Sequence, residues 1–286
     1  MIERVSSSPS RVGECPLWDS ELLRLYWLDI DGMQIHQLDP SSGVVTSIAT
    51  PGRPGSMALT SSPGRLKVAM ENEFVDFDFD TGDWDQWLTL EAAGSGNRLN
   101  DGRCDRQGRF WVGSMHEDAE SGRFSGLLHQ ILPGGEHRIV QDQIGISNGI
   151  AFSPSGDTMY FADTPRRTVW AYDYEPDTGK RSGNRVFTDF SGLPGLPDGA
   201  CVDDEGCYWV ACVFGSAIAR LTPNGLLDRI IELPVDKPTA PTFGGPDLNT
   251  LYVTSIGSGD ASENAEQGHV YALDVGARGL SEPAFG

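Results

Sequence analysis

The sequence has few basic residues and no cluster of them. Its 286 residues include 21 Lys and Arg against 41 Asp and Glu, which gives a formal charge of −20. Proteins that bind nucleic acid neutralise phosphates with grouped Lys and Arg side chains, so this class is excluded. The same negative charge opposes contact with an anionic membrane surface. We therefore expect neither nucleic acid nor a membrane as a partner.

Long apolar runs are also missing. No run approaches the roughly 20 residues that a membrane helix requires, and the N-terminal residues lack an apolar stretch of signal-peptide length. The cysteines are odd in number and show no CxxC spacing: Cys15, Cys104, Cys201, Cys207 and Cys212. We expect reduced, structural thiols and a cytoplasmic location. The five histidines lack HExxH spacing, so no histidine metal site is indicated.

No segment shows a helical period of apolar residues over three turns, which disfavours an α/β fold. Instead, 35 Gly and 18 Pro separate short apolar runs, as in all-β proteins. Three segments resemble one another: NDGRCDRQGRFWVGSM from Asn100, SNGIAFSPSGDTMYFADT from Ser147, and PDGACVDDEGCYWVACV from Pro197. Weaker copies begin at Gly13, Gly55 and Pro241. Their spacing of roughly 42 to 50 residues is typical of a four-stranded propeller blade.

The repeat predicts an all-β fold, a six-bladed β-propeller of four-stranded antiparallel blades that occupies residues 1–286 as a single domain. The last unit lacks an outer strand after GHVYALDV. We expect the N-terminal segment IERVSS, which begins at Ile2, to supply that strand and close the ring.

In a propeller, the first strand of each blade lines the central channel, so the residues that lead these strands converge at one mouth. The leading positions hold Glu14, Ser56, Asn100 with Asp101, Asn148, Asp198 and Thr242. A polar residue before Gly is most often only turn chemistry, but here the fold would bring several such turns together. Two carboxylates and an amide oxygen at one point require a counter-ion. Glu14, Asn148 and Asp198 are therefore the predicted ligands of one divalent metal ion. Ca²⁺ is the first choice, with Zn²⁺, Mn²⁺ or Mg²⁺ as alternatives.

A serine nucleophile is not indicated. Residues 145–149 (GISNG) formally match GxSxG, but that nucleophile elbow requires a helix after the serine. The segment IAFSP that follows has the pattern of a strand.

The chain resembles the senescence marker protein/gluconolactonase/luciferin-regenerating enzyme family. The resemblance rests on GECPLW, NRLNDGRCDRQGRFWVGSM, SNGIAFSPSGDTMYFADT, LPDGACVDDEGCYWVA and FGGPDLNTLYVTS, in order along nearly the whole chain. It implies a propeller with one catalytic divalent metal held by the Glu, Asn and Asp of the GECPLW, SNG and PDG motifs. It also implies that Arg98 and Asn100 hold the substrate or a metal-bound water. Glu117 and Asp118 compete for a further substrate contact, and Cys15 replaces a Gly of the usual pattern.

The predicted function is a metal-dependent hydrolase that opens a sugar lactone to the aldonic acid with metal-activated water. Asp198 is the expected general base as well as a ligand, because a carboxylate beside that water can take its proton. Two alternatives remain open: a phosphotriesterase at the same site, and a non-catalytic interaction propeller. We expect a small sugar lactone as the partner and no obligatory protein partner. The stretch CVFGSAIAR departs from many relatives, so the identity of the sugar is not carried over.

Overall fold

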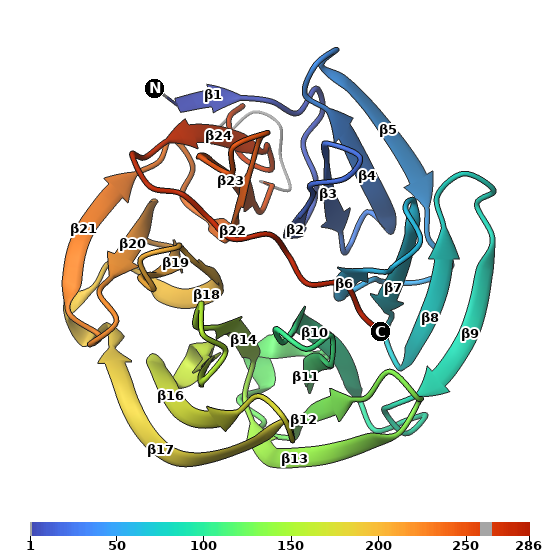
Figure 1. The fold of residues 1–286 in the computed structure, drawn as a ribbon, viewed down its shortest axis with the longest axis vertical. Coiled ribbons are helices and arrows are strands. Elements are labelled where there is room, and N and C mark those ends of the chain that lie inside the picture. The colour runs from blue at the N-terminus through green and yellow to red at the C-terminus, as the bar shows by residue number, and fades with distance from the viewer. Residues whose placement is uncertain (1, 258–264) are drawn as a thin grey trace.

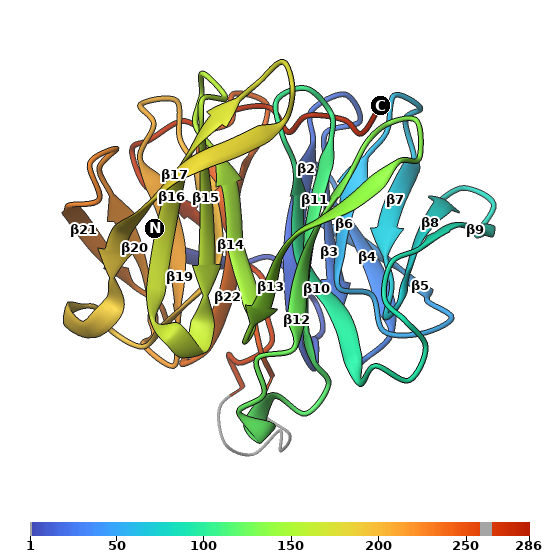
Figure 2. The same ribbon diagram turned by 90° about the horizontal axis from the view of Figure 1, so that it is seen from below.

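The described residues, 2–257 and 265–286 of a computed structural model, form six four-stranded sheets arranged around a central channel (Figure 1). Neighbouring strands within each sheet are antiparallel. The side view shows the sheets standing around the axis as the blades of a propeller (Figure 2). The prediction of a six-bladed, all-β propeller is confirmed.

The strands follow the chain from the channel outwards in five of the six blades. Blades 1 to 3 contain β2 (Gly13–Asp19), β3 (Arg24–Asp29), β4 (Gln34–Asp39), β5 (Val44–Ala49), β6 (Ser56–Leu59), β7 (Arg65–Ala69), β8 (Glu73–Asp78), β9 (Trp84–Thr89), β10 (Asn97–Cys104), β11 (Phe110–His116), β12 (Gly126–Ile131) and β13 (His137–Ile144).

Blades 4 to 6 contain β14 (Ser147–Phe152), β15 (Thr158–Asp163), β16 (Thr168–Glu175), β17 (Lys180–Asp189), β18 (Leu196–Val202), β19 (Tyr208–Val213), β20 (Ala217–Leu221), β21 (Leu227–Glu232), β22 (Pro238–Gly244), β23 (Thr250–Ser255), β24 (Tyr271–Asp274) and β1 (Ile2–Arg4). Three single-turn 3₁₀ helices also occur: η1 (Ala119–Ser121), η2 (Thr164–Arg166) and η3 (Phe190–Gly192). None of the helices in the described ranges is long and apolar enough to cross a membrane.

Burial falls from the innermost strand to the outermost. All residues of β14 and β22 are buried, whereas most residues of β13 and β21 are exposed or partly exposed. The inner strands pack against their neighbours in the ring as well as against the next strand of their own blade. Both faces of an inner strand are therefore covered, which explains why few of its residues are exposed. The cores lie between blades, and buried Trp27, Trp111 and Trp209 fill parts of them.

Both ends of the chain contribute to the closure of the ring. β1 pairs with β24 as the outermost strand of blade 6, with Ile2 opposite Leu273. After β24, the C-terminal segment (residues 275–286) crosses the channel towards β6 (Figure 1). Its Glu282 forms a 2.9 Å ion pair with Arg103, and the backbone N–H of Phe285 donates to the carbonyl of Leu59. The repeat pattern contained no sign of this segment, because it is not part of any blade.

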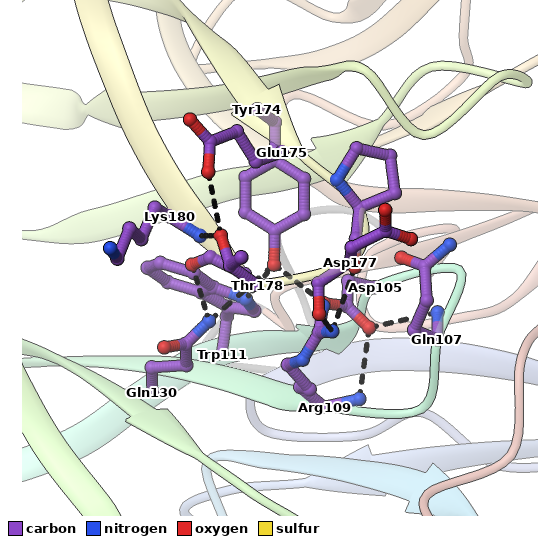
Figure 3. Close-up of polar contacts among 12 residues, drawn as sticks. Asp105, Gln107, Arg109, Trp111, Gln130, Tyr174, Glu175, Asp177, Thr178 and Lys180 are labelled. Carbon is purple, nitrogen blue, oxygen red and sulfur yellow. Dashed lines mark hydrogen bonds and ion pairs between the residues drawn. The ribbon is translucent and has the colours of Figure 1, made fainter.

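A hydrogen-bonded network joins blades 3 and 4 at the end of β10 (Figure 3). The buried Asp105 carboxylate accepts hydrogen bonds from the backbone N–H groups of Gln107 and Arg109. Its other oxygen accepts from the Arg109 guanidinium and from the hydroxyl of Tyr174 in blade 4. Trp111 donates its indole N–H to the same hydroxyl at 3.1 Å. The network therefore connects a turn of one blade to the third strand of the next.

Replacing Tyr174 with Phe is expected to lower the free energy of unfolding by about 1.5–3 kcal/mol. The change removes a hydrogen bond from a buried, charged acceptor, and such bonds have about this value. Urea denaturation measures the effect. Tyr172→Phe is the matched control on the same strand, since its hydroxyl donates to the neutral amide oxygen of Gln141 at 3.4 Å rather than to a carboxylate. Equal stability of the two variants would contradict the role assigned to the network.

Candidate active site at the channel mouth

A β-bulge recurs near the start of most of the inner strands. The pairing register shifts between Glu14 and Leu17, between Leu99 and Gly102, and between Asn148 and Ala151. It shifts again in β18 and β22, directly after Pro197 and Pro238, whereas β6 pairs without a shift. Bulges bend a strand and redirect its side chains. Four of them lie at leading residues identified from the sequence: Glu14, Asn100 with Asp101, Asn148 and Asp198. The prediction is wrong for Thr242, because the bulge of β22 lies before it, and Ser56 lies in a strand without a bulge.

Glu14 lies at the first of these bulges. The next residue, Cys15, has a φ of 47°, in the left-handed region that glycine adopts most easily. The family pattern usually has Gly at this position, so the backbone keeps the glycine conformation despite the side chain. The Cys15 N–H points back and donates to Oε2 of Glu14 at 3.1 Å. The substitution therefore leaves the Glu14 carboxylate at the head of β2.

Asn148, Asn100 and Arg98 form a hydrogen-bonded chain across two blades. Asn100 Nδ2 donates to Oδ1 of Asn148 at 3.2 Å, and Arg98 Nη1 donates to Oδ1 of Asn100 at 2.8 Å. Asn148 Nδ2 donates to the Thr164 hydroxyl, which in turn donates to the carbonyl of Pro197. This fixes the amide of Asn148 with its oxygen directed away from Thr164. Asn148 is also linked to the residue that precedes Asp198.

The carboxylates of Glu14, Asp101 and Asp198 influence one another's pKa values, and we call these three groups the carboxylate cluster. Burial, followed by the charge of Asp101, raises the pKa of Glu14 to about 8, although the Cys15 N–H and Arg98 oppose this shift. Burial raises the pKa of Asp198 well above its usual value, and the charges of Glu14 and Asp101 raise it further. The protein alone therefore does not stabilise all these negative charges.

Asp101 was among the leading residues but was not predicted as a ligand. Its Oδ2 accepts a 2.9 Å hydrogen bond from the N–H of Ile150 in blade 4. Burial raises its pKa, with opposition from that hydrogen bond and from Arg103. Thr164, which orients Asn148, was not anticipated at all. Its only sequence signal is its position directly after a strand, and many structural residues share that position.

Arg98 is partly buried beside other charged groups of the mouth. Burial lowers the pKa of Arg98, and the positive charge of Arg53 lowers it further, whereas Asp31, Glu14 and Glu117 raise it. Its guanidinium makes no ion pair with a carboxylate within 4 Å among the described residues. It is therefore a cation whose hydrogen bonds go to an amide and a carbonyl rather than to an acid.

Glu117 and Asp118 have different surroundings. A carboxylate oxygen of Glu117 lies 3.4 Å from Arg53 Nη2, and half of its side chain is exposed. Asp118 caps η1 instead, because its Oδ1 accepts a hydrogen bond from the N–H of Glu120 at 3.2 Å. Of the two acids, Glu117 is the one whose charge reaches Arg98.

A second acidic group lies at the opposite end of blade 5. Ligand atoms of Asp203, Glu205 and Cys207 lie within 4.8 Å of one another. The guanidinium of Arg220 contacts both Asp203 and Glu205, and Asp203 also accepts a hydrogen bond from the indole of Trp209. An arginine already neutralises these acids, so the group is an internal ion-pair network. The carboxylate cluster has no comparable partner among the described residues.

The fold and the mouth together define a class: six-bladed propellers with buried acidic and amide oxygens where the inner strands begin. A match to a family model identifies the family within this class. Residues 12–257 match the SMP-30/Gluconolactonase/LRE-like region, and the chain belongs to that family.

Individual relatives align along almost the whole chain. The 6-deoxy-6-sulfogluconolactonase of Pseudomonas putida is 35% identical over 98% of this chain and 97% of its own length. The pentonolactonase of Haloferax volcanii is 33% identical, over 98% and 97% respectively. Among solved structures, a calcium-binding regucalcin from Agrobacterium tumefaciens superimposes with a TM-score of 0.94. It is 30% identical, and the match covers 99% of this chain and 96% of the other.

Proposed function

We propose that the protein hydrolyses the ring ester of a sugar lactone to give the aldonic acid, with a divalent cation at the carboxylate cluster. The observation that carries the proposal is the pair of carboxylates at one mouth: Asp198 is buried, Glu14 is partly buried, and the pKa of each is raised. Relatives named as lactonases of a sulfogluconic acid and of a pentonic acid support the substrate class.

The residues present fit a hard divalent cation. Glu14 and Asp198 offer carboxylate oxygens and Asn148 offers an amide oxygen, which are the ligand types that Ca²⁺ and Mg²⁺ prefer. Such an ion would offset the charge that burial makes unfavourable. Ca²⁺ is our first choice, and the description of the Agrobacterium relative as calcium-binding supports it. When bound, a divalent cation supplies a Lewis acid that polarises the lactone carbonyl.

The side chains around the cluster account for the remaining chemistry. The carboxylate of Asp198 takes a proton from the attacking water as the new C–O bond forms at the lactone carbonyl carbon. The ring C–O bond then breaks, and the same proton passes to the departing ring oxygen. The net reaction adds one water molecule across the ester. Arg98 and Asn100, which are already oriented by their mutual hydrogen bond, bind the sugar and stabilise the oxyanion.

The proposal is tested by acid release from a panel of aldonolactones after the spontaneous rate has been subtracted. The protein is assayed as prepared, after chelation, and after Ca²⁺, Mn²⁺, Zn²⁺ or Mg²⁺ has been restored. Hydrolysis that is lost on chelation and returns with one ion supports both the reaction and the cation. A protein that binds the ion but hydrolyses no lactone in the panel contradicts the proposal, and a phosphotriester included in the panel tests the other hydrolytic chemistry.

Glu117→Gln is expected to raise KM for the lactone about fivefold with little change in kcat. Gln keeps an acceptor oxygen, so the change weakens the hydrogen bond that a sugar hydroxyl donates to this half-exposed side chain, by about 1 kcal/mol. Steady-state kinetics on the best lactone of the panel provides the measurement. Asp118→Asn is the matched control and should leave KM unchanged, because that side chain caps η1. The reverse result would assign the substrate contact to Asp118.

A further inference from the structure

A cavity of about 450 Å³ lies in blade 2, and no residue of the carboxylate cluster lines it. Its walls come from the loop before β6, the turn between β7 and β8, and the outermost strand β9 at the rim of the ring (Figure 1). Its lining includes Glu71, Asn72, Glu73, Trp84 and Gln86. Its volume is within the range of small-molecule sites.

The cavity adjoins the strand that holds the proposed substrate residues. The carbonyl of Glu71 accepts a 2.8 Å hydrogen bond from the N–H of Leu99, the residue between Arg98 and Asn100. The Glu71 carboxylate accepts from Arg53 Nε at 2.8 Å, and Arg53 also contacts Glu117. Arg53 therefore connects the lining of the cavity to Glu117 at the mouth.

The lining combines an aromatic ring with planar polar groups. Trp84 is partly exposed and packs on Phe77 with a ring-centroid distance of 4.1 Å, so its orientation is fixed. Gln86 donates to Glu73 at 2.8 Å. Asn72 uses its backbone carbonyl for Leu90 and Glu91, and its side-chain amide has no partner among the described residues.

These groups suit a pyranose ring. The C–H face of a sugar packs on an aromatic face, and its hydroxyl groups pair with amide and carboxylate oxygens and with amide N–H donors.

The charge of the lining restricts the ligand further. Arg53 already pairs with the Glu71 carboxylate. Glu73 forms no ion pair with Lys or Arg within the described residues, so its negative charge remains in the wall. A phosphate, sulfonate or carboxylate group placed here would meet like charge. The cavity therefore favours a neutral sugar.

We propose that this cavity is a subsite for a neutral pyranose, filled either by the second sugar of a disaccharide lactone or by a free neutral sugar. The choice of ligand class rests on the proposed lactonase function. The binding itself depends only on the lining of the cavity, and it is measured without any hydrolysis.

The first experiment measures the binding of cellobiose to the full-length protein by saturation-transfer NMR and calorimetry. Cellobiose should bind the wild-type protein, and Trp84→Ala and Asn72→Ala should each weaken the Kd about tenfold. Asn72→Ala leaves the Trp84–Phe77 contact intact, so it remains informative if Trp84→Ala unfolds. Trp170→Ala, a partly exposed tryptophan of blade 4, is the control and should not alter the Kd. No cellobiose binding, or an unchanged Kd in both variants, overturns the proposal.

A second experiment identifies the source of the sugar by comparing kcat/KM for cellobionolactone and gluconolactone. If the variants lower only the cellobionolactone value, about tenfold, the subsite holds the second unit of the substrate. If neither value changes while cellobiose binding is lost, it holds a free sugar. Cellobiose binding without hydrolysis of any lactone would remove the proposed function but keep the subsite. Lactone hydrolysis without cellobiose binding would keep the proposed function but overturn the subsite.

Discussion

Asp198→Asn is expected to lower kcat/KM for lactone hydrolysis by about 10³-fold. The substitution keeps the shape of the side chain but removes the proton acceptor, an effect of about 10²–10⁴ by itself. It also removes one of the two carboxylates proposed to hold the cation, so the Kd of the cation should rise as well. Initial rates of acid release and a calorimetric titration with Ca²⁺ measure the two effects separately.

The control for this variant lies in the same blade. Asp204 is exposed, and its N–H donates to the carbonyl of Arg278 near the opposite end of the inner strand. Asp204→Asn makes the same chemical change to the protein and should keep kcat/KM within twofold of the wild-type value. If Asp198→Asn retained full activity and full cation affinity, the assignment of Asp198 as both base and ligand would be wrong.

The second large effect concerns the metal-free protein, whose free energy of unfolding should fall as the pH rises from about 4.5 to about 8. The pKa of Glu14 is raised from its usual 4.5 to about 8, so the folded state holds a proton that the unfolded chain releases within this window. When the unfolded state binds fewer protons than the folded state, stability decreases with increasing pH. Asp198 contributes in the same direction, since its pKa is also raised.

A divalent cation should reverse this loss. At a concentration of 100 times its Kd, it should stabilise the protein at pH 8 by about 2.7 kcal/mol, which for a chain of this size corresponds to a rise in Tm of about 4–5 °C. At pH 5, protons compete for the carboxylates, so the same concentration should have a smaller effect. Thermal denaturation with and without chelator at both pH values makes the comparison. A larger cation effect at pH 5 than at pH 8 would contradict the proposed site.

The fold could be predicted because its information is local and repeated. Each blade repeats a polar residue with Gly, a short strand, a turn and a second apolar strand, as in the unit that begins at Ser147. A propeller blade consists of consecutive strands, so the order of the strands in the sheet follows the order in the sequence. The C-terminal segment could not be predicted in this way. Its contacts join Glu282 to Arg103 and Phe285 to Leu59, residues that are distant in the chain.

The sequence by itself determined the blades and the polar residues that lead their inner strands, because both depend on patterns within about 45 residues. Those patterns identified Glu14, Asn148 and Asp198 as candidate metal ligands. Only the tertiary structure decided how these residues are paired, charged and oriented. The hydrogen bond from Asn100 to Asn148 joins two blades, as does the hydrogen bond from Ile150 to Asp101. The raised pKa values likewise require several blades to come together, since Glu14, Asp101 and Asp198 belong to blades 1, 3 and 5.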